Sequence, residues 1–113
     1  MSEWTDEAAC KGADFSKFYP SRAFDEAHLE SKYCSRCPVS GLCLSQGIVN
    51  NELGWWASTE RERVRLRRRQ PWRAVQSALL AAYKKGEYIP TYTQLKMSAI
   101  AGTLRRYIER ESQ

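Results

Sequence analysis

The chain carries four cysteines, and all of them lie within its first 43 residues. They stand at Cys10, Cys34, Cys37 and Cys43, so that one remote cysteine precedes a close group of three. The chain has only 113 residues, of which 42% are hydrophobic, so the apolar core that it can build is thin. Small domains of this kind are commonly reinforced by disulfides or a metal. The cysteines therefore constrain the fold more than any other feature.

The beginning of the chain bears on the redox state of these cysteines. The first ten residues, MSEWTDEAAC, lack the basic and apolar regions of a secretory signal. No later run of apolar residues is long enough to cross a membrane. We therefore expect a cytoplasmic protein without a membrane partner. In a reducing cytoplasm, clustered cysteines more often bind metal or carry out redox chemistry than form structural disulfides.

The spacing of the cysteines suggests a shared centre. Two residues separate Cys34 from Cys37, and five separate Cys37 from Cys43. Four thiolates can bind either a zinc ion or a [4Fe–4S] cluster. Zinc modules usually present two close pairs of ligands, whereas one remote cysteine and a group of three favour iron and sulfur. A zinc-bound nucleic-acid-binding module, a thiol-disulfide oxidoreductase that uses Cys34 and Cys37, and separate buried cysteines remain as alternatives.

Charge divides the chain into two unlike parts. Residues 1–59 carry five basic and eight acidic side chains, whereas residues 60–113 carry 13 basic and five acidic ones. Such a division is typical of a metal-binding module followed by a segment that meets a polyanion. The alternative is a solvated helix that keeps the protein soluble. Because arginine forks suit phosphate oxygens, we predict DNA contacts for the arginines that are concentrated here, which are Arg61, Arg63, Arg65, Arg67, Arg68, Arg69 and Arg73.

Hydrophobic periodicity and end signals predict an all-α fold. Helices are expected over residues 21–33, from just after Pro38 to about residue 49, and from Glu60 to about residue 69. A capping box of Thr59 and Glu62 marks the start of the third helix. We divide the chain into a cysteine-bearing module at residues 1–58, a basic helix at 59–71 and a helical extension at 72–113.

The extension is expected to form a helical hairpin. Its first helix begins after Pro71 and ends near Gly86, with an apolar stripe of Trp72, Val75, Leu79, Ala82 and Tyr83. A capping box of Thr91 and Gln94 opens the second helix. That helix is predicted to continue through Gly102 and to present one face made of Met97, Ile100, Ala101, Leu104 and Ile108. The stripes with Leu79 and Tyr83 and with Leu104 and Ile108 would pack together.

Residues 4–69 resemble the WhiB-like proteins, which are small transcription factors of actinobacteria and their phages. The resemblance depends on Trp4 before Cys10, the Phe18-Tyr19-Pro20 element, the Cys34-x2-Cys37-x5-Cys43 group, the Gly54-to-Trp56 turn and the Glu60-Arg61-Glu62-Arg63 helix start. It implies that Cys10, Cys34, Cys37 and Cys43 hold a [4Fe–4S] cluster that is sensitive to oxygen or nitric oxide. It also implies binding to region 4 of the principal sigma factor and to promoter DNA, and it implies no enzymatic activity and no small-molecule substrate.

The family pattern also implies an aromatic patch that faces the sigma factor, formed by Trp4, Phe18, Tyr19 and Trp56. One departure concerns the turn itself, which in the family is glycine, a branched aliphatic, tryptophan and two glycines. Here it is Gly54-Trp55-Trp56-Ala57-Ser58. Without the last two glycines, either the turn has a different geometry or it includes a strained residue. Because two adjacent tryptophans in a turn cannot both point inward, we expect at least one at the surface.

Overall fold

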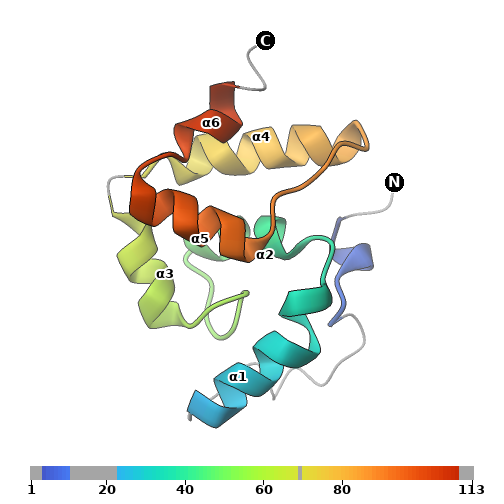
Figure 1. The fold of residues 1–113 in the computed structure, drawn as a ribbon, viewed down its shortest axis with the longest axis vertical. Helices are drawn as coiled ribbons and strands as arrows, with labels where there is room; N and C mark the ends of the chain where they lie inside the picture. Colours follow the sequence, from blue (N-terminus) through green and yellow to red (C-terminus); the bar gives the residue numbers. More distant parts are fainter. Residues whose placement is uncertain (1–3, 11–22, 69, 110–113) are drawn as a thin grey trace.

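Six α-helices make up the all-α fold among the residues that the structure describes. The structure, a computed structural model, describes residues 4–10, 23–68 and 70–109 of the chain. No strand occurs in these ranges. With η for a 3-10 turn, the elements are η1 (Trp4–Glu7), α1 (Ala23–Lys32), η3 (Cys34–Arg36), α2 (Ser40–Val49), α3 (Glu60–Arg67), α4 (Trp72–Lys84), α5 (Tyr92–Ala101) and α6 (Arg105–Glu109) (Figure 1).

The central element is α2, which packs against α3, α4 and α5. Its leucines and isoleucine are almost fully buried. Two glycines let other segments approach it closely. A Cβ atom at Gly41 would overlap the carbonyl oxygen of Pro90, and one at Gly47 would lie 2.6 Å from the Cβ of Trp56. The helix therefore has no room for larger side chains where the extension and the tryptophan turn pack on it.

One hydrophobic core joins the cysteine module to the extension. Its buried members come from η1, α2, α3, α4, α5 and the turn before α6, and include Trp4, Leu42, Leu79, Leu95 and Leu104. The predicted stripe on α4 is buried as expected, with Tyr83 partly buried at its end. The α4 helix packs on α6, as the hairpin prediction requires, and also along α2. The extension is thus part of the same core as the cysteines.

The second helix of the extension differs from its prediction. The capping box of Thr91 and Gln94 is present, but the helix ends at Ala101 because Gly102 adopts a left-handed conformation with φ +74°. A separate short helix, α6, follows. Met97 and Ile100, predicted on the apolar face of this helix, are 66% and 82% exposed. The buried residues of α5 are instead Tyr92, Leu95 and Ala99, because α2 covers that side of the helix.

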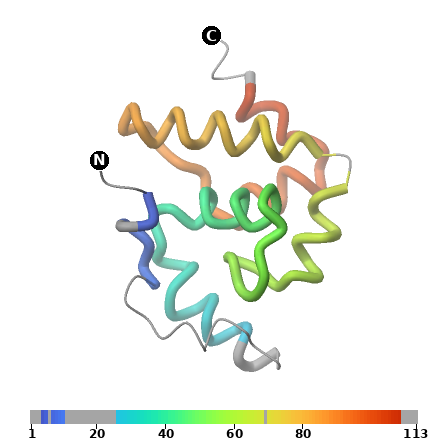
Figure 2. The backbone as a smooth tube through the Cα atoms, turned by 180° about the vertical axis from the view of Figure 1, so that it is seen from behind, coloured from blue at the N-terminus to red at the C-terminus, as the bar shows by residue number. Residues whose placement is uncertain are grey.

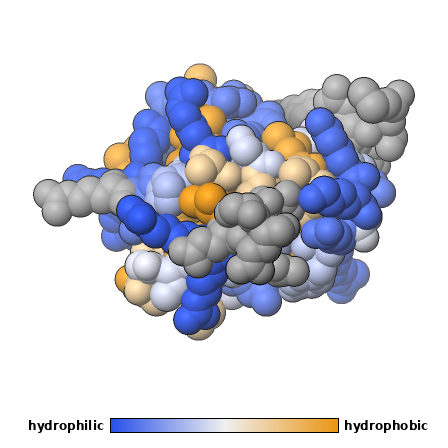
Figure 3. Space-filling view, turned by 90° about the horizontal axis from the view of Figure 1, so that it is seen from above, coloured by the Kyte–Doolittle hydropathy of each residue, from blue (hydrophilic) through white to orange (hydrophobic). Residues whose placement is uncertain are grey.

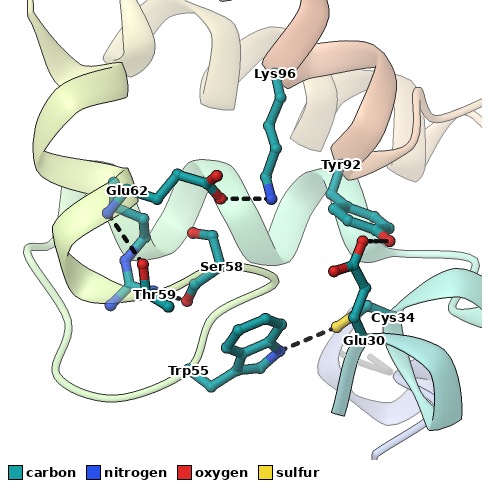
Figure 4. A network of polar contacts seen from close by, with 9 residues as sticks. Glu30, Cys34, Trp55, Ser58, Thr59, Glu62, Tyr92 and Lys96 are labelled. Carbon is teal, nitrogen blue, oxygen red and sulfur yellow. Dashed lines mark hydrogen bonds and ion pairs between the residues drawn. The ribbon is translucent and has the colours of Figure 1, made fainter. Parts of the chain in front are cut away.

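The start of α3 is capped by Thr59, whose side chain accepts a hydrogen bond from the backbone N–H of Glu62. The Glu62 carboxylate does not complete the predicted box. It forms an ion pair of 2.6 Å with Lys96 on α5 and so ties the two helices together (Figure 4). None of the helices in the described ranges has the length and apolar character needed to span a membrane.

Candidate metal centre

The four cysteines come from three short stretches of the chain. Cys10 follows η1, Cys34 opens η3, Cys37 ends that turn, and Cys43 lies within α2. All four are free thiols, and all are partly buried. The N-terminal segment lies beside the turn between α1 and α2 in both ribbon views (Figures 1 and 2). The fold therefore brings the remote cysteine back to the close group of three.

Electrostatic coupling connects the thiols. Burial raises the pKa of Cys34 to about 11, and the neighbouring Cys37 and Cys10 and the carboxylate of Glu30 raise it as well. Burial is also the largest cause of the raised pKa of Cys43, followed by the charges of Cys34, Cys10 and Cys37. The pKa of Cys10 is raised by burial and then by Cys37. If these thiols were ionised, they would repel one another, and a cation between them would relieve that repulsion.

The donor set suits a metal centre. Cysteine thiolates are the ligands that zinc and iron–sulfur clusters prefer. Because burial raises the pKa values of Cys10, Cys34 and Cys43 and favours their protonated forms, binding of a metal would release protons and would couple its free energy to folding. Within the described ranges, no three Cys, His, Asp or Glu side chains are arranged closely enough to hold a single metal ion. The four cysteines suit a metal centre because they are thiols, are partly buried and influence one another's charge.

Trp55 covers this centre. Its indole N–H donates a 3.2 Å hydrogen bond to the sulfur of Cys34, and the side chain is only 8% exposed (Figure 4). It forms a small buried cluster with Leu29, and Cys10 and Cys34 pack against this cluster. The hydrogen bond lowers the pKa of Cys34, against the larger effect of burial. Trp55 thus shields two of the thiols from water and stabilises negative charge on one of them.

Trp56 is the less buried of the two tryptophans, so it meets only in part the expectation that one of the pair lies at the surface. Its side chain is partly buried against the core, and its indole N–H donates to the carbonyl of Leu53 at 3.2 Å. Leu53 is 71% exposed beside it. Leu53 was not among the predicted site residues. An apolar side chain directly before the turn glycine Gly54 is the sequence signal that indicates an exposed apolar contact here.

The turn that carries the tryptophans contains a strained residue. Ala57, which stands where the family pattern has a glycine, has φ +60° and is fully buried. A side chain in this region costs about 1–2 kcal/mol. Gly54 is also left-handed, and its N–H donates to the carboxylate of Glu60. The turn therefore keeps a left-handed geometry at Ala57 at the expense of strain.

Arg63 holds this turn together. Its side chain is 2% exposed, and its guanidinium donates hydrogen bonds to the carbonyl oxygens of Ser58, Glu52 and Gly54. The prediction that Arg63 contacts DNA is therefore wrong. Its guanidinium N–H groups are bonded to three backbone carbonyls, because the turn folds back over the start of α3. Burial lowers the pKa of Arg63, which the nearby Glu60 opposes.

The other arginines of the run are exposed where the structure describes them, which is at Arg61, Arg65, Arg67, Arg68 and Arg73. Arg67 also donates to the carbonyl of Ile48 at 2.7 Å and to the side chain of Asn51 at 3.0 Å. Arg69 lies outside the described residues. Exposure leaves these guanidinium groups, apart from the bonded part of Arg67, open to an external anion.

The predicted aromatic patch is only partly described. Trp4 is buried in the main core and so contributes packing instead of an exposed contact, because η1 folds onto the other helices. Phe18 and Tyr19 lie outside the described residues. Of the four predicted members, Trp56 is the described residue that reaches the surface, and Leu53 accompanies it.

An open cavity of about 820 Å³ reaches Cys37 from the solvent. Its walls combine the cysteine turn with Tyr83 and Lys84 at the end of α4 and with Tyr88 and Ile89 in the loop before α5. The extension therefore borders the solvent-facing side of the cysteine centre.

Comparison with known families agrees with this arrangement. The family model described as "Transcription factor WhiB" matches residues 4–66, which is more than half of the chain. The matched segment includes all four cysteines, the tryptophan turn and nearly all of α3. No curated protein and no solved structure matches the chain significantly. On the family match, which contains every element of the cysteine centre, this chain belongs to the WhiB family of transcription factors.

Proposed function

We propose that this protein is a cytoplasmic transcription regulator whose four cysteines hold a [4Fe–4S] cluster, and that it binds region 4 of the principal sigma factor and promoter DNA. The observation that carries the proposal is the hydrogen bond from Trp55 to Cys34, above four mutually coupled thiols. A buried N–H aimed at a sulfur stabilises a thiolate ligand. Hydrogen bonds to the sulfurs and exclusion of water also tune the potential of such clusters.

The residues around the centre have separate tasks in this proposal. Cys10, Cys34, Cys37 and Cys43 would be the ligands, and the bound cluster would supply a redox-active centre that responds to oxygen or nitric oxide. Trp55 would exclude water, and Arg63 would keep Trp55 in place by holding the turn. No step here needs catalysis, so the proposal describes a regulator and not an enzyme.

Two surfaces would bind two partners. The exposed Leu53 and the partly buried Trp56 form the apolar tip of the turn, and aromatic residues are common hot spots of protein interfaces. This tip is the proposed contact with sigma region 4. The exposed arginines of α3 are the proposed contact with DNA phosphates, which supply affinity more than sequence specificity.

Purification without oxygen tests the central part of the proposal. The wild-type protein should be brown and should show the visible charge-transfer absorption of an iron–sulfur cluster. It should contain about four iron and four sulfide ions per chain. Cys10→Ala should lose the cluster and helical content, because metal-binding energy is folding energy in small domains. Ser35→Ala, an exposed change between two ligands, is the matched control and should keep both.

Other results would support the alternatives. A colourless protein that contains one zinc per chain would identify a zinc module. Turnover of a disulfide substrate by the cluster-free protein, lost in Cys37→Ala, would identify an oxidoreductase. A Cys10→Ala protein with full iron and sulfide content would contradict the four-cysteine ligand set.

A further inference from the structure

The ends of α3 and α5 and the starts of α4 and α6 lie together at one corner of the molecule (Figures 1 and 2). The side-chain amide of Gln70, in the linker between α3 and α4, donates to the carbonyl of Ala99 near the end of α5 at 3.2 Å. The indole of Trp72, at the start of α4, donates to the carbonyl of Leu66 near the end of α3 at 2.7 Å. The ribbon views place the start of α6 beside these ends (Figures 1 and 2). Residues as far as 29 positions apart are thus held together at one corner.

Exposed arginines from three helices gather around this corner. Arg67 and Arg68 end α3, Arg73 lies in the first turn of α4, and Arg105 and Arg106 open α6. The α6 helix packs on α4, with Leu104 and Trp72 in the same core. Looking down on α4 and α6, Figure 3 shows hydrophilic side chains around much of the rim of this face.

Among the side chains that the structure describes, no ion pair is recorded for Arg68, Arg73, Arg105 or Arg106. Lys96, by contrast, pairs with Glu62. Like charges held together without anions repel one another and destabilise the fold. An external polyanion would supply a counter-charge.

Helix stability does not account for this arrangement. A cation in the last turn of a helix interacts favourably with the helix dipole, which could explain Arg65 and Arg67 on α3. Arg73 lies in the first turn of α4, where the dipole disfavours a cation, and that turn has no acidic residue. Its position is therefore better explained by an external ligand than by folding.

We propose that Arg67, Arg68, Arg73, Arg105 and Arg106 form a single phosphate-binding corner for duplex DNA, to which the extension contributes through α4 and α6. The inference rests on the proposed function, in which the arginines of α3 contact DNA. It adds that residues 72–109, beyond the segment that matches the family, take part in the same contact. Guanidinium groups from several elements can bind phosphates along a strand without reading bases.

The test is the affinity of the full-length protein for a duplex of about three helical turns, measured against salt concentration. R105A/R106A on α6 and R67A/R68A on α3 are compared with K84A/K85A, which removes the same charge from the opposite end of α4. The first two variants should each lower the slope of log affinity against log salt by about two and weaken binding at least about tenfold. The control should change little. R105K/R106K should keep most of the slope, because lysine retains the charge.

Each outcome decides between the two claims. If R67A/R68A lowers the slope and R105A/R106A does not, the proposed DNA contact of α3 stands and the corner is wrong. If neither lowers it, both claims fail. Equal losses in K84A/K85A would indicate a diffuse charge effect and overturn the corner. Loss of binding to sigma region 4 in R105A/R106A, with an unchanged slope, would make α6 a protein interface and also overturn it. Thermal melts by circular dichroism check that all variants remain folded.

Discussion

The phenol of Tyr92 on α5 donates a 2.6 Å hydrogen bond to the carboxylate of Glu30 on α1 (Figure 4). Glu30 lies one helical turn before Cys34, so the bond connects the extension to the segment that leads into the cysteine centre. The backbone N–H of Tyr92 donates to the hydroxyl of Ser40 at 3.1 Å, and Lys96 lies 5.0 Å from the centre of its ring. These contacts explain why the extension packs as part of the cysteine module.

Removing this bond should destabilise the protein in a pH-dependent way. Tyr92→Phe should lower the free energy of unfolding at pH 7 by about 1.5–3 kcal/mol, the value of a hydrogen bond to a charged group. Burial, and next the bond to Glu30, raises the pKa of Tyr92 to about 12 from its ordinary 10. The stabilisation is therefore fully present below pH 10 and is lost as the pH rises from 10 towards 12.

The measurement for Tyr92 is urea unfolding of the wild type and the variant between pH 7 and pH 12. The difference in unfolding free energy between the two proteins should shrink above pH 10. Taking this difference cancels the effect of lysines, which titrate in both proteins. Tyr88→Phe is the control, because Tyr88 is exposed and bonds Gln94 at the surface. A constant difference over the whole range would contradict the role of the Tyr92 hydroxyl.

Loss of Arg63 should cost far more stability than loss of a neighbouring arginine. Arg63→Ala leaves three carbonyls of the tryptophan turn without a donor, and each such group costs about 1–3 kcal/mol. We expect at least about 3 kcal/mol less stability in chemical denaturation. Arg61→Ala, at an exposed position of the same helix, should change it by less than about 0.5 kcal/mol. Similar values for the two would show that Arg63 is not a structural residue.

Relief of backbone strain should stabilise the turn. Ala57→Gly removes the side chain from a residue at φ +60°, so the variant should gain up to about 1 kcal/mol. Ala57→Val should lose stability, because a β-branched side chain fits this conformation worst and the site is buried. Melting temperatures that rank valine, alanine and glycine in ascending order are expected. A lower melting temperature for glycine than for alanine would rule out strain at this position.

The proposed sigma contact predicts that Trp56 matters for sigma binding and not for the cluster. Trp56→Ala should weaken binding to sigma region 4 by about 2 kcal/mol or more, as truncation of a hot-spot aromatic does, while iron and sulfide content stay unchanged. Tyr88→Ala, which removes an exposed aromatic side chain elsewhere, is the control for binding by titration calorimetry. Undiminished binding by Trp56→Ala would exclude the turn as the contact, and loss of cluster and binding together would make Trp56 a core residue.

Local signals were enough to predict most of the helices. Thr59 and Thr91 cap α3 and α5 as expected, and Gly86 follows α4 in a left-handed conformation. These signals act within one or two helical turns, so they can be read directly from the chain. The same holds for the stripe on α4, whose spacing at 3.6 residues already defines a buried face.

What the sequence by itself determined was the all-α class, the positions of the helix starts and the set of four thiols, because these depend on neighbouring residues and on side-chain chemistry. Only the tertiary structure decided that Arg63 is buried while Arg61 and Arg65 are exposed, and that Met97 and Ile100 face solvent. Both depend on which segment covers a helix: the turn covers one side of α3, and α2 covers one side of α5. Burial arises from contacts between distant residues, and a single helix cannot reveal which of its faces a neighbour will cover.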